Sequence, residues 1–242
     1  LIGVLVAFVF TSLIGVTLKG HKKRHALHLS NTKKIGGRTK SRHQWSISKV
    51  IREHQFYQIC LVAITPAFIL TGLFFHQVYL AELKGWSLKW LAICFAGFAI
   101  SRLLSALLIG PMIDRFTARI ILPWYLLPLA LGLIILTSSE HVLSLLIFMV
   151  FAGISTGSGA NISSALWAEL YGPSHLGAIK SLATAIMVFS SALSPAFFGL
   201  LLDNDVSMNY ITSIMAAYIC LVSTNCFFRL KKINDKISDI LA

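Results

Sequence analysis

Residues 110–119 read GPMIDRFTAR and bring one Asp and two Arg together between two strongly apolar runs. The preceding run is FAGFAISRLLSALLI (residues 95–109), and the following one is IILPWYLLPLALGLII (residues 120–135). Charged side chains between apolar helices belong at a membrane surface, because each costs about 2.5 kcal/mol or more in the bilayer centre. We therefore interpret the stretch from Gly110 to Arg119 as a turn that connects two transmembrane helices.

The composition of the whole chain supports a membrane protein. Of its 242 residues, 56% are hydrophobic and only 12% are charged, which a soluble domain of this size does not accommodate. Runs of roughly 20 apolar residues, the length of a membrane-crossing helix, recur along the chain. We mark seven of them: Leu1–Leu18, Tyr57–Ala81, Trp86–Ile109, Ile120–Ser138, Val142–Ala168, Ala178–Leu202 and Met208–Phe228. The sequence therefore predicts an all-α membrane protein with seven transmembrane helices.

The net charge of +12 is distributed by side rather than spread evenly. Eleven Lys and Arg lie in the gap Lys19–Phe56, and alternate gaps bring the total on that side to eighteen, against only Lys84 and Lys89 on the other. Such asymmetry follows the positive-inside rule and favours a lipid bilayer over a nucleic acid as the partner. It predicts a multi-pass protein of the cytoplasmic membrane with a cytoplasmic C-terminus. Trp86 and Trp90 then lie near an outer end, as interfacial anchors.

The long basic gap reads as a linker. Residues 19–48 are basic and polar without an apolar period, so we expect a cytoplasmic segment that rests on anionic lipid. Its three spaced His residues lack a Cys or acidic companion, which favours a solvated tract over a metal site. Ile47, Val50, Ile51 and His54 follow helical spacing and predict a short interfacial helix. We expect no cofactor and no metal, and the four Cys lie in apolar segments as small buried residues.

The charged turn resembles the signature loop of the major facilitator superfamily, which reads roughly G-x-L-x-D-R-x-G-R-K. Gly110, Asp114 and Arg115 match this pattern, and Arg119 falls on its last basic position. The chain departs from the pattern at three positions, Met112, Thr117 and Ala118.

The order of segments resembles the same superfamily over essentially the whole chain. The resemblance implies that residues 1–18 are the last helix of an N-terminal half and residues 19–56 the central linker. Residues 57–229 are then a C-terminal six-helix half, followed by a cytoplasmic tail at 230–242. We expect the preceding half of the same transporter as a partner. The stretches WAELYGPSHLGAIKS (167–181) and ALSPAFFGLLLD (192–203) also resemble the family, and the chain looks closest to oxalate/formate antiporters and monocarboxylate carriers.

The resemblance implies a conformational latch at the cytoplasmic end. Gly110 would let a neighbouring helix approach closely, and Asp114 would face the positive N-terminus of the sixth segment. Arg115 and Arg119 would pair with Glu169, and these pairs would break as the two halves rock. The alternative is that these are ordinary loop charges of the positive-inside kind.

Arg102 is the basic residue that falls well inside a predicted span, away from its ends. It lies eight residues from Gly110, about 12 Å in from the cytoplasmic end. One interpretation is a cavity-facing cation that binds an anionic substrate, with Ser101 and Ser105 helping to hydrate the site. The other is a side chain that snorkels inward or pairs with a carboxylate. All nine Asp and Glu lie at segment ends or in gaps, so the chain offers no acid in a membrane centre to carry a proton.

His76 is the second candidate for substrate contact. Thr65, Gly72 and His76 lie near one helical face, and Gln77 lies just beside them. This face suits a cavity wall, which would give His76 and Gln77 a substrate or proton-sensing role. A single His near an interface is also commonly a hydrogen-bonded structural residue, and that alternative stays open.

A stripe of small residues marks the fifth segment. Gly153, Gly157, Asn161 and Ala165 recur every four residues, which predicts close packing against another helix. Asn161 is alternatively a cavity-facing substrate contact. Pro195 in the sixth segment is a candidate kink.

Together these features predict secondary active transport of a small solute by alternating access, and an organic anion such as a mono- or dicarboxylate as the substrate. A seven-helix receptor is a poorer interpretation, because no Cys lies in an outer gap and the last helix lacks a Pro. We do not expect an enzyme, since no segment carries paired carboxylates or a Ser/His/Asp set. An inactive or truncated half-transporter is the main alternative.

Overall fold

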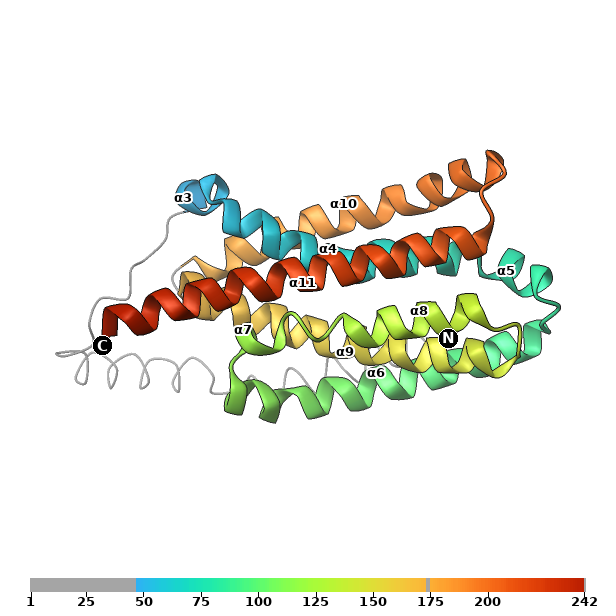
Figure 1. The fold of residues 1–242 in the computed structure, drawn as a ribbon, viewed down its shortest axis with the longest axis horizontal. Coiled ribbons are helices and arrows are strands. Elements are labelled where there is room, and N and C mark those ends of the chain that lie inside the picture. The colour runs from blue at the N-terminus through green and yellow to red at the C-terminus, as the bar shows by residue number, and fades with distance from the viewer. Residues whose placement is uncertain (1–46, 173–174, 242) are drawn as a thin grey trace, which may run out of the picture. The chain divides into compact units, whose positions relative to one another are not determined.

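The computed structural model describes residues 47–172 and 175–241, and over this part of the chain it contains helices and no strands. The first predicted segment and most of the basic linker lie outside the described residues. The helices, shown in Figure 1, are α3 (Ile47–Arg52), α4 (His54–Phe75), α5 (Gln77–Leu83), α6 (Leu88–Phe116), α7 (Ala118–Ile121), α8 (Leu127–Ser138), α9 (Leu143–Tyr171), α10 (Leu176–Asp203) and α11 (Met208–Leu241).

Five of these helices are long and apolar enough to cross a membrane, namely α4, α6, α9, α10 and the first 22 residues of α11. The shorter α8 is also apolar. These elements coincide with the six predicted segments that fall within the described residues. The predicted all-α membrane bundle is therefore confirmed for this part of the chain.

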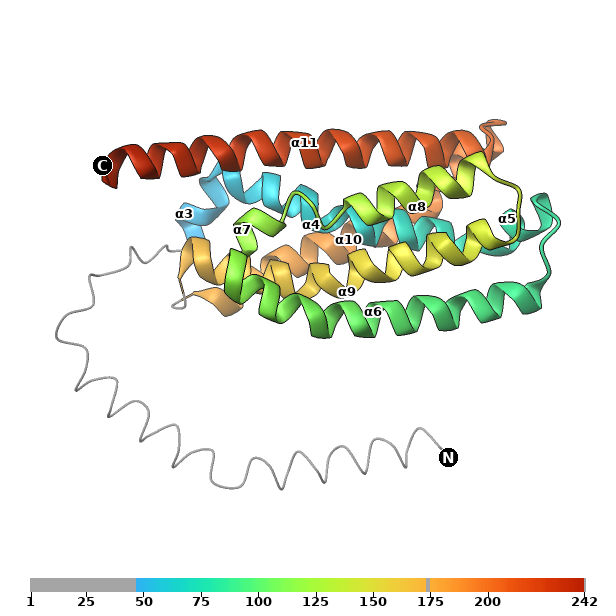
Figure 2. The same cartoon turned by 60° about the horizontal axis from the view of Figure 1, so that its bottom comes forward.

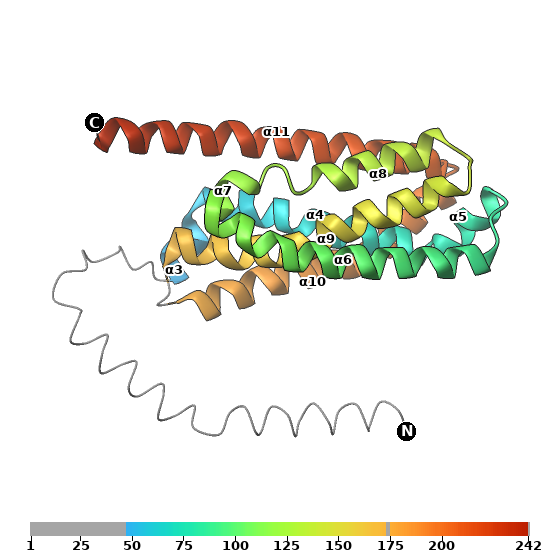
Figure 3. The same ribbon diagram turned by 90° about the horizontal axis from the view of Figure 1, so that it is seen from below.

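Helix α9 is central to the packing. It lies against α6 along one side and against α8 along another, while α10 packs on α4 and α11 packs on α8 (Figures 2 and 3). Half of the apolar window of α9 is buried, against 17% for α6 and 11% for α10. Long faces of α6 and α10 therefore remain open on the described bundle.

The small-residue stripe brings α6 and α9 close together. A Cβ atom added to Gly153 would lie 1.9 Å from Ser101 Oγ, and one added to Gly157 would lie 2.2 Å from the carbonyl oxygen of Arg102. Asn161 Nδ2 donates a hydrogen bond of 2.8 Å to the Ala106 carbonyl of the same neighbouring helix. Helices in a bilayer associate through close packing and hydrogen bonds of this kind, because lipid removes the hydrophobic driving force.

Two segments expected to be continuous are interrupted. The segment Tyr57–Ala81 breaks at His76, which lies between α4 and α5. The segment Ile120–Ser138 breaks at residues 122–126, between α7 and α8, where the backbone forms turns instead of regular helix. Pro123 lies inside this second break, and a Pro removes a helical hydrogen bond and clashes with the preceding turn. The apolar run alone gave no sign of either interruption.

The break at residues 122–126 also provides a hydrogen bond to α4. Pro66 lies inside α4 and has no N–H, so it leaves the carbonyl of Val62 four residues earlier without its helical donor. The Tyr125 hydroxyl, from the interrupted segment, donates a hydrogen bond of 2.8 Å to this carbonyl. Such side-chain donors are how membrane helices tolerate a Pro. The break at residues 122–126 thus supplies, through Tyr125, the hydrogen-bond donor that Pro66 removes from α4.

Residues 110–119 are mostly helical and do not form a continuous turn. Residues 110–116 continue α6 through Pro111, and the helix ends only at Phe116. The turn is confined to Thr117, whose φ of 67° and ψ of 150° redirect the chain before α7 begins at Ala118. The expectation of a ten-residue charged turn is therefore wrong, because a Gly-Pro pair weakens a membrane helix without necessarily ending it.

The opposite end of the bundle is fixed by a cluster around the two predicted Trp anchors. Trp86 Nε1 donates to the Glu140 carbonyl at 3.0 Å, and Trp90 Nε1 donates to the Val142 carbonyl at 2.8 Å. The Lys84 ammonium donates to the Ser139 carbonyl at 3.0 Å, and burial lowers the pKa of this ammonium despite the nearby Glu140 carboxylate. These contacts join the α5–α6 connection to the α8–α9 connection.

Candidate substrate cavity and charged latch

A cavity of about 520 Å³ lies among α4, α6, α9 and α10, with Tyr125 as a further wall residue. Its α4 wall runs from Ala63 to Phe74, and its α9 wall runs from Ser155 to Trp167. At 1.5 Å per residue each wall is roughly 16–18 Å long. The α9 wall reaches toward the end of the bundle that carries Thr117, which we call the latch end, and the α4 wall reaches the opposite way to Phe74, near the end of α4.

Arg102 lines this cavity from the middle of α6. Its backbone lies against Gly157 of α9, so the small size of Gly157 determines where the Arg102 side chain leaves α6. The two neighbouring serines do not line the cavity. Ser101 Oγ donates to the Phe98 carbonyl at 3.0 Å and Ser105 Oγ to the Ile154 carbonyl at 2.8 Å. Both hydroxyls thus donate within the helix pair, and their role in hydrating the site stays a prediction.

Lys180 is a second cation in the cavity, and it was not among the residues predicted to bind substrate. It lies in the second turn of α10, lines the cavity, and its ammonium donates a hydrogen bond to Ser164 Oγ of α9. Its position near the start of a predicted segment made it look like one more loop charge. The available signal was that it falls inside that segment, two residues after the segment begins at Ala178.

The polar groups of the cavity are unevenly available. The charged side chains among its described lining residues, Arg102 and Lys180, are both cationic. Several hydroxyls are already used by the protein: Thr156 Oγ1 donates to the Ala152 carbonyl at 2.9 Å, and Ser155 Oγ accepts from the Leu129 N–H at 3.1 Å. The electrostatic character of the cavity is therefore set by two cations on opposite helices.

Three other residues predicted to contact substrate are not brought to this cavity. His76 Nδ1 lies 2.9 Å from the Gly72 carbonyl, and the imidazole ring stacks on Phe198 with centroids 6.3 Å apart. Gln77 lines a separate cavity of only about 10 Å³. Asn161 is engaged with α6 as described above. Helix α4 turns the face of Gly72 and His76 toward α10, which is why the predicted cavity stripe became a packing face.

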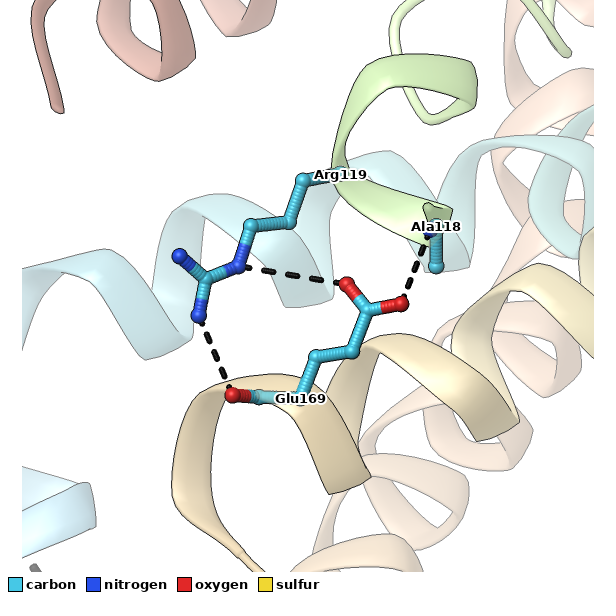
Figure 4. Close-up of polar contacts among 3 residues, drawn as sticks. All are labelled: Ala118, Arg119 and Glu169. Carbon is cyan, nitrogen blue, oxygen red and sulfur yellow. Dashed lines mark hydrogen bonds and ion pairs between the residues drawn. The ribbon is translucent and has the colours of Figure 1, made fainter. Parts of the chain in front are cut away.

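At the latch end, Glu169 joins the last turn of α9 to α7 (Figure 4). Its Oε1 accepts a hydrogen bond of 2.9 Å from the Ala118 N–H, and its Oε2 lies 3.9 Å from Arg119 Nε. Arg119 also donates to the Glu169 backbone carbonyl at 3.0 Å. The carboxylate thus satisfies a free N–H at the start of α7 and faces a cation at the same time. The expected contact between Arg119 and Glu169 is present.

The other residues of the predicted latch lie apart from Glu169. Arg115 is exposed, and its guanidinium lies 5.5 Å from the ring centroid of Phe116. Asp114 is exposed and forms no hydrogen bond or ion pair with another described residue. Within the described part of the chain, no atom lies within 4 Å of a Cβ placed on Gly110, so the expected close approach does not occur there. These three residues project from α6 on sides that the described bundle leaves open.

Thr117 stands where the superfamily pattern has its second Gly, and its backbone explains that preference. A φ of 67° with a ψ of 150° is a region populated almost only by Gly, because a Cβ is strained there by about 1–3 kcal/mol. This conformation directs the Ala118 N–H and Arg119 toward Glu169. Thr117 therefore holds a conformation that strains its side chain at the turn between α6 and α7.

A bundle of apolar helices around a charged, elongated cavity is the organisation of a membrane transport protein. The family model described as Major Facilitator Superfamily matches residues 1–238. The chain therefore belongs to the major facilitator superfamily, a family of membrane transporters of small solutes. A search of the curated proteins finds no match to the chain.

Proposed function

We propose that this chain takes part in secondary active transport of an organic anion, a mono- or dicarboxylate, across the cytoplasmic membrane. The observation that carries the proposal is the charge of the cavity: its two charged described lining residues, Arg102 and Lys180, are both cations. An Arg guanidinium binds a carboxylate through two parallel hydrogen bonds, and a Lys ammonium adds a mobile positive charge. The resemblance to oxalate/formate antiporters and monocarboxylate carriers points to the same class of substrate.

The proposed mechanism is alternating access. The substrate would bind near the membrane midplane between this six-helix half, residues 57–229, and a preceding half to which residues 1–18 belong. The basic linker and the C-terminal tail would be cytoplasmic, which makes the latch end the inner end of the bundle. There the contact of Glu169 with Arg119 would hold one conformation and break in the other. Gly110, Asp114 and Arg115 would complete this latch with groups of the preceding half.

Exchange of anions fits this half better than proton symport. All nine Asp and Glu of the chain lie at segment ends or in gaps, and the cavity has no carboxylate among its described lining residues. A proton-coupled mechanism needs a group in the pathway that gains and loses a proton. An antiporter needs only that two anions compete for the same cations.

The test is thermal stability of the purified protein in detergent against acetate, oxalate, succinate, glucose and a quaternary ammonium compound. A ligand stabilises the state that it binds, so a carboxylate should raise the unfolding midpoint. Arg102→Gln and Lys180→Gln should each reduce this shift. Lys89→Gln, which removes a cation from an exposed position on α6, is the matched control and should keep it. Stabilisation by glucose or the cation alone, unchanged in the Arg102 variant, would overturn the anion proposal.

A further inference from the structure

The cavity is longer and less polar than a two-carbon acid requires, and this limits the kind of anion that fits it. We infer that its substrate is an elongated amphipathic organic anion, in which a carboxylate is attached to an apolar, ring-bearing body. This inference rests on the proposed function, because it assumes that an anion occupies the cavity.

The backbone of Arg102 and the ammonium of Lys180 lie at different levels of the bundle. The Arg102 backbone contacts Gly157 and the Lys180 ammonium contacts Ser164, so α9 gives both positions a common scale. Gly157 and Ser164 are seven residues apart, which corresponds to about 10 Å along a helix. A carboxylate of the size of acetate or oxalate fills only part of a cavity whose walls are roughly 16–18 Å long.

The walls of the cavity carry a strip of apolar side chains. Ala63, Pro66, Ala67 and Leu70 of α4 belong to it, as does Ala160, which lies between Gly157 and Ser164 on α9, while Thr71 and Ser163 add hydroxyl groups to the same walls. The apolar side chains offer no hydrogen bond to water or to a polar substrate. Apolar surface of this kind gains free energy when an apolar ligand covers it, in proportion to the area removed from water.

The walls of the cavity also carry aromatic rings. Phe74 and Phe98 meet edge to face at the deep end, with centroids 5.5 Å apart and planes at 89°. Trp167 lines the latch end. The Tyr125 hydroxyl is already bound to the Val62 carbonyl, and its ring packs over Gly159. Tyr125 therefore presents its ring, and not its hydroxyl, to the cavity. Ring edges and faces in this arrangement suit an aromatic ligand.

The experiment compares acetate, benzoate and 2-naphthoate with the neutral 2-naphthylmethanol, and measures dissociation constants from the dose dependence of thermal stability. The three acids share one carboxylate and differ in the size of the apolar body. We expect 2-naphthoate to bind at least about tenfold more tightly than acetate, since each buried carbon adds affinity. The neutral alcohol should bind much more weakly than 2-naphthoate.

Two variants locate the apolar body. Ala160→Leu fills the cavity between the levels of Gly157 and Ser164, so it should weaken 2-naphthoate binding severalfold and leave acetate unchanged. Ala196→Leu makes the same change at an exposed position of α10 outside the cavity, and should change neither. Retained acetate binding in Ala160→Leu also establishes that this variant is folded.

The outcomes separate this inference from the proposed function. If acetate and 2-naphthoate bind equally well and both lose affinity in Arg102→Gln, the elongated amphipathic substrate is excluded while anion binding stands. If 2-naphthylmethanol binds as well as 2-naphthoate, the charge is irrelevant and both proposals fail. If Ala160→Leu leaves the preference for 2-naphthoate intact, the apolar body lies elsewhere and the inference is wrong.

Discussion

Replacing Gly157 with Ala tests whether α9 sets the position of Arg102. The added Cβ would lie 2.2 Å from the Arg102 carbonyl oxygen and 3.0 Å from its carbonyl carbon. Both are backbone atoms, so no side-chain rotation relieves the overlap. Since Cβ atoms essentially never come closer than 3.0 Å to another heavy atom, α6 and α9 must separate by roughly 1 Å. Overpacking of this kind typically costs about 1–3 kcal/mol.

The matched control is Gly110→Ala, in the same chain and also within a helix. No described atom lies within 4 Å of its new Cβ. Both substitutions gain the same helical propensity, about 1 kcal/mol, because Ala restricts the unfolded chain more than Gly. The difference between the two variants therefore isolates the steric cost. We expect Gly110→Ala to be neutral or stabilised, and Gly157→Ala to be less stable than it by about 1–3 kcal/mol.

The assay is the midpoint of thermal unfolding in detergent, followed by binding of whichever acid stabilises the parent protein. Separation of α6 from α9 displaces the base of the Arg102 side chain, so Gly157→Ala should also bind that acid more weakly. Equal stability of the two variants would show that the helices do not approach as closely as described. Lower stability with unchanged acid binding would show that Arg102 is not positioned through Gly157.

Further predictions follow from the latch and from the Pro in α4. Thr117→Gly should raise stability by about 1 kcal/mol, measured by thermal unfolding, because it removes a strained Cβ, whereas a loss would show that the backbone is not strained. Glu169→Ala should lower stability by about 1–2 kcal/mol through the lost cap, with the exposed Glu82→Ala as a neutral control in the same measurement. Tyr125→Phe should cost about 1–3 kcal/mol, but clearly less in a Pro66→Ala background, where the helix supplies its own donor; equal costs in a double-mutant cycle would contradict this pairing.

The helices were predictable because the bilayer imposes a single length and composition on every span. The six apolar runs that fall within the described residues all appear as helix. Their interruptions were not predictable from hydropathy. The breaks at His76 and at residues 122–126 leave the apolar character of their two segments unchanged. They depend instead on which neighbouring helix satisfies the backbone groups that lose their helical partners. Conversely, the span predicted to end at Ile109 continues as helix through Pro111 to Phe116.

The site was predictable only in part, for a related reason. Arg102 stood out because a charge inside an apolar run is costly without a purpose. Lys180 did not, because a cation at the edge of a run has an ordinary explanation. His76 and Asn161 were assigned to the cavity from helical spacing, but spacing defines a face without saying which neighbour covers it. In the structure these faces pack against α10 and α6.

One helix connects the cavity to the latch. Along α9, Gly157 contacts the backbone of Arg102, Ser164 contacts Lys180, and Glu169 contacts the start of α7 and Arg119. The three contacts lie seven and five residues apart, and each involves a different neighbouring element. A tilt of α9 relative to α6 and α10 would therefore change the distance between the two cations and the geometry of the latch in the same movement. Packed contacts of this kind switch between discrete arrangements and do not deform continuously. An anion that bridges α6 and α10 would therefore favour one arrangement over the other. Substrate occupancy and latch closure are then expected to be coupled through α9 itself.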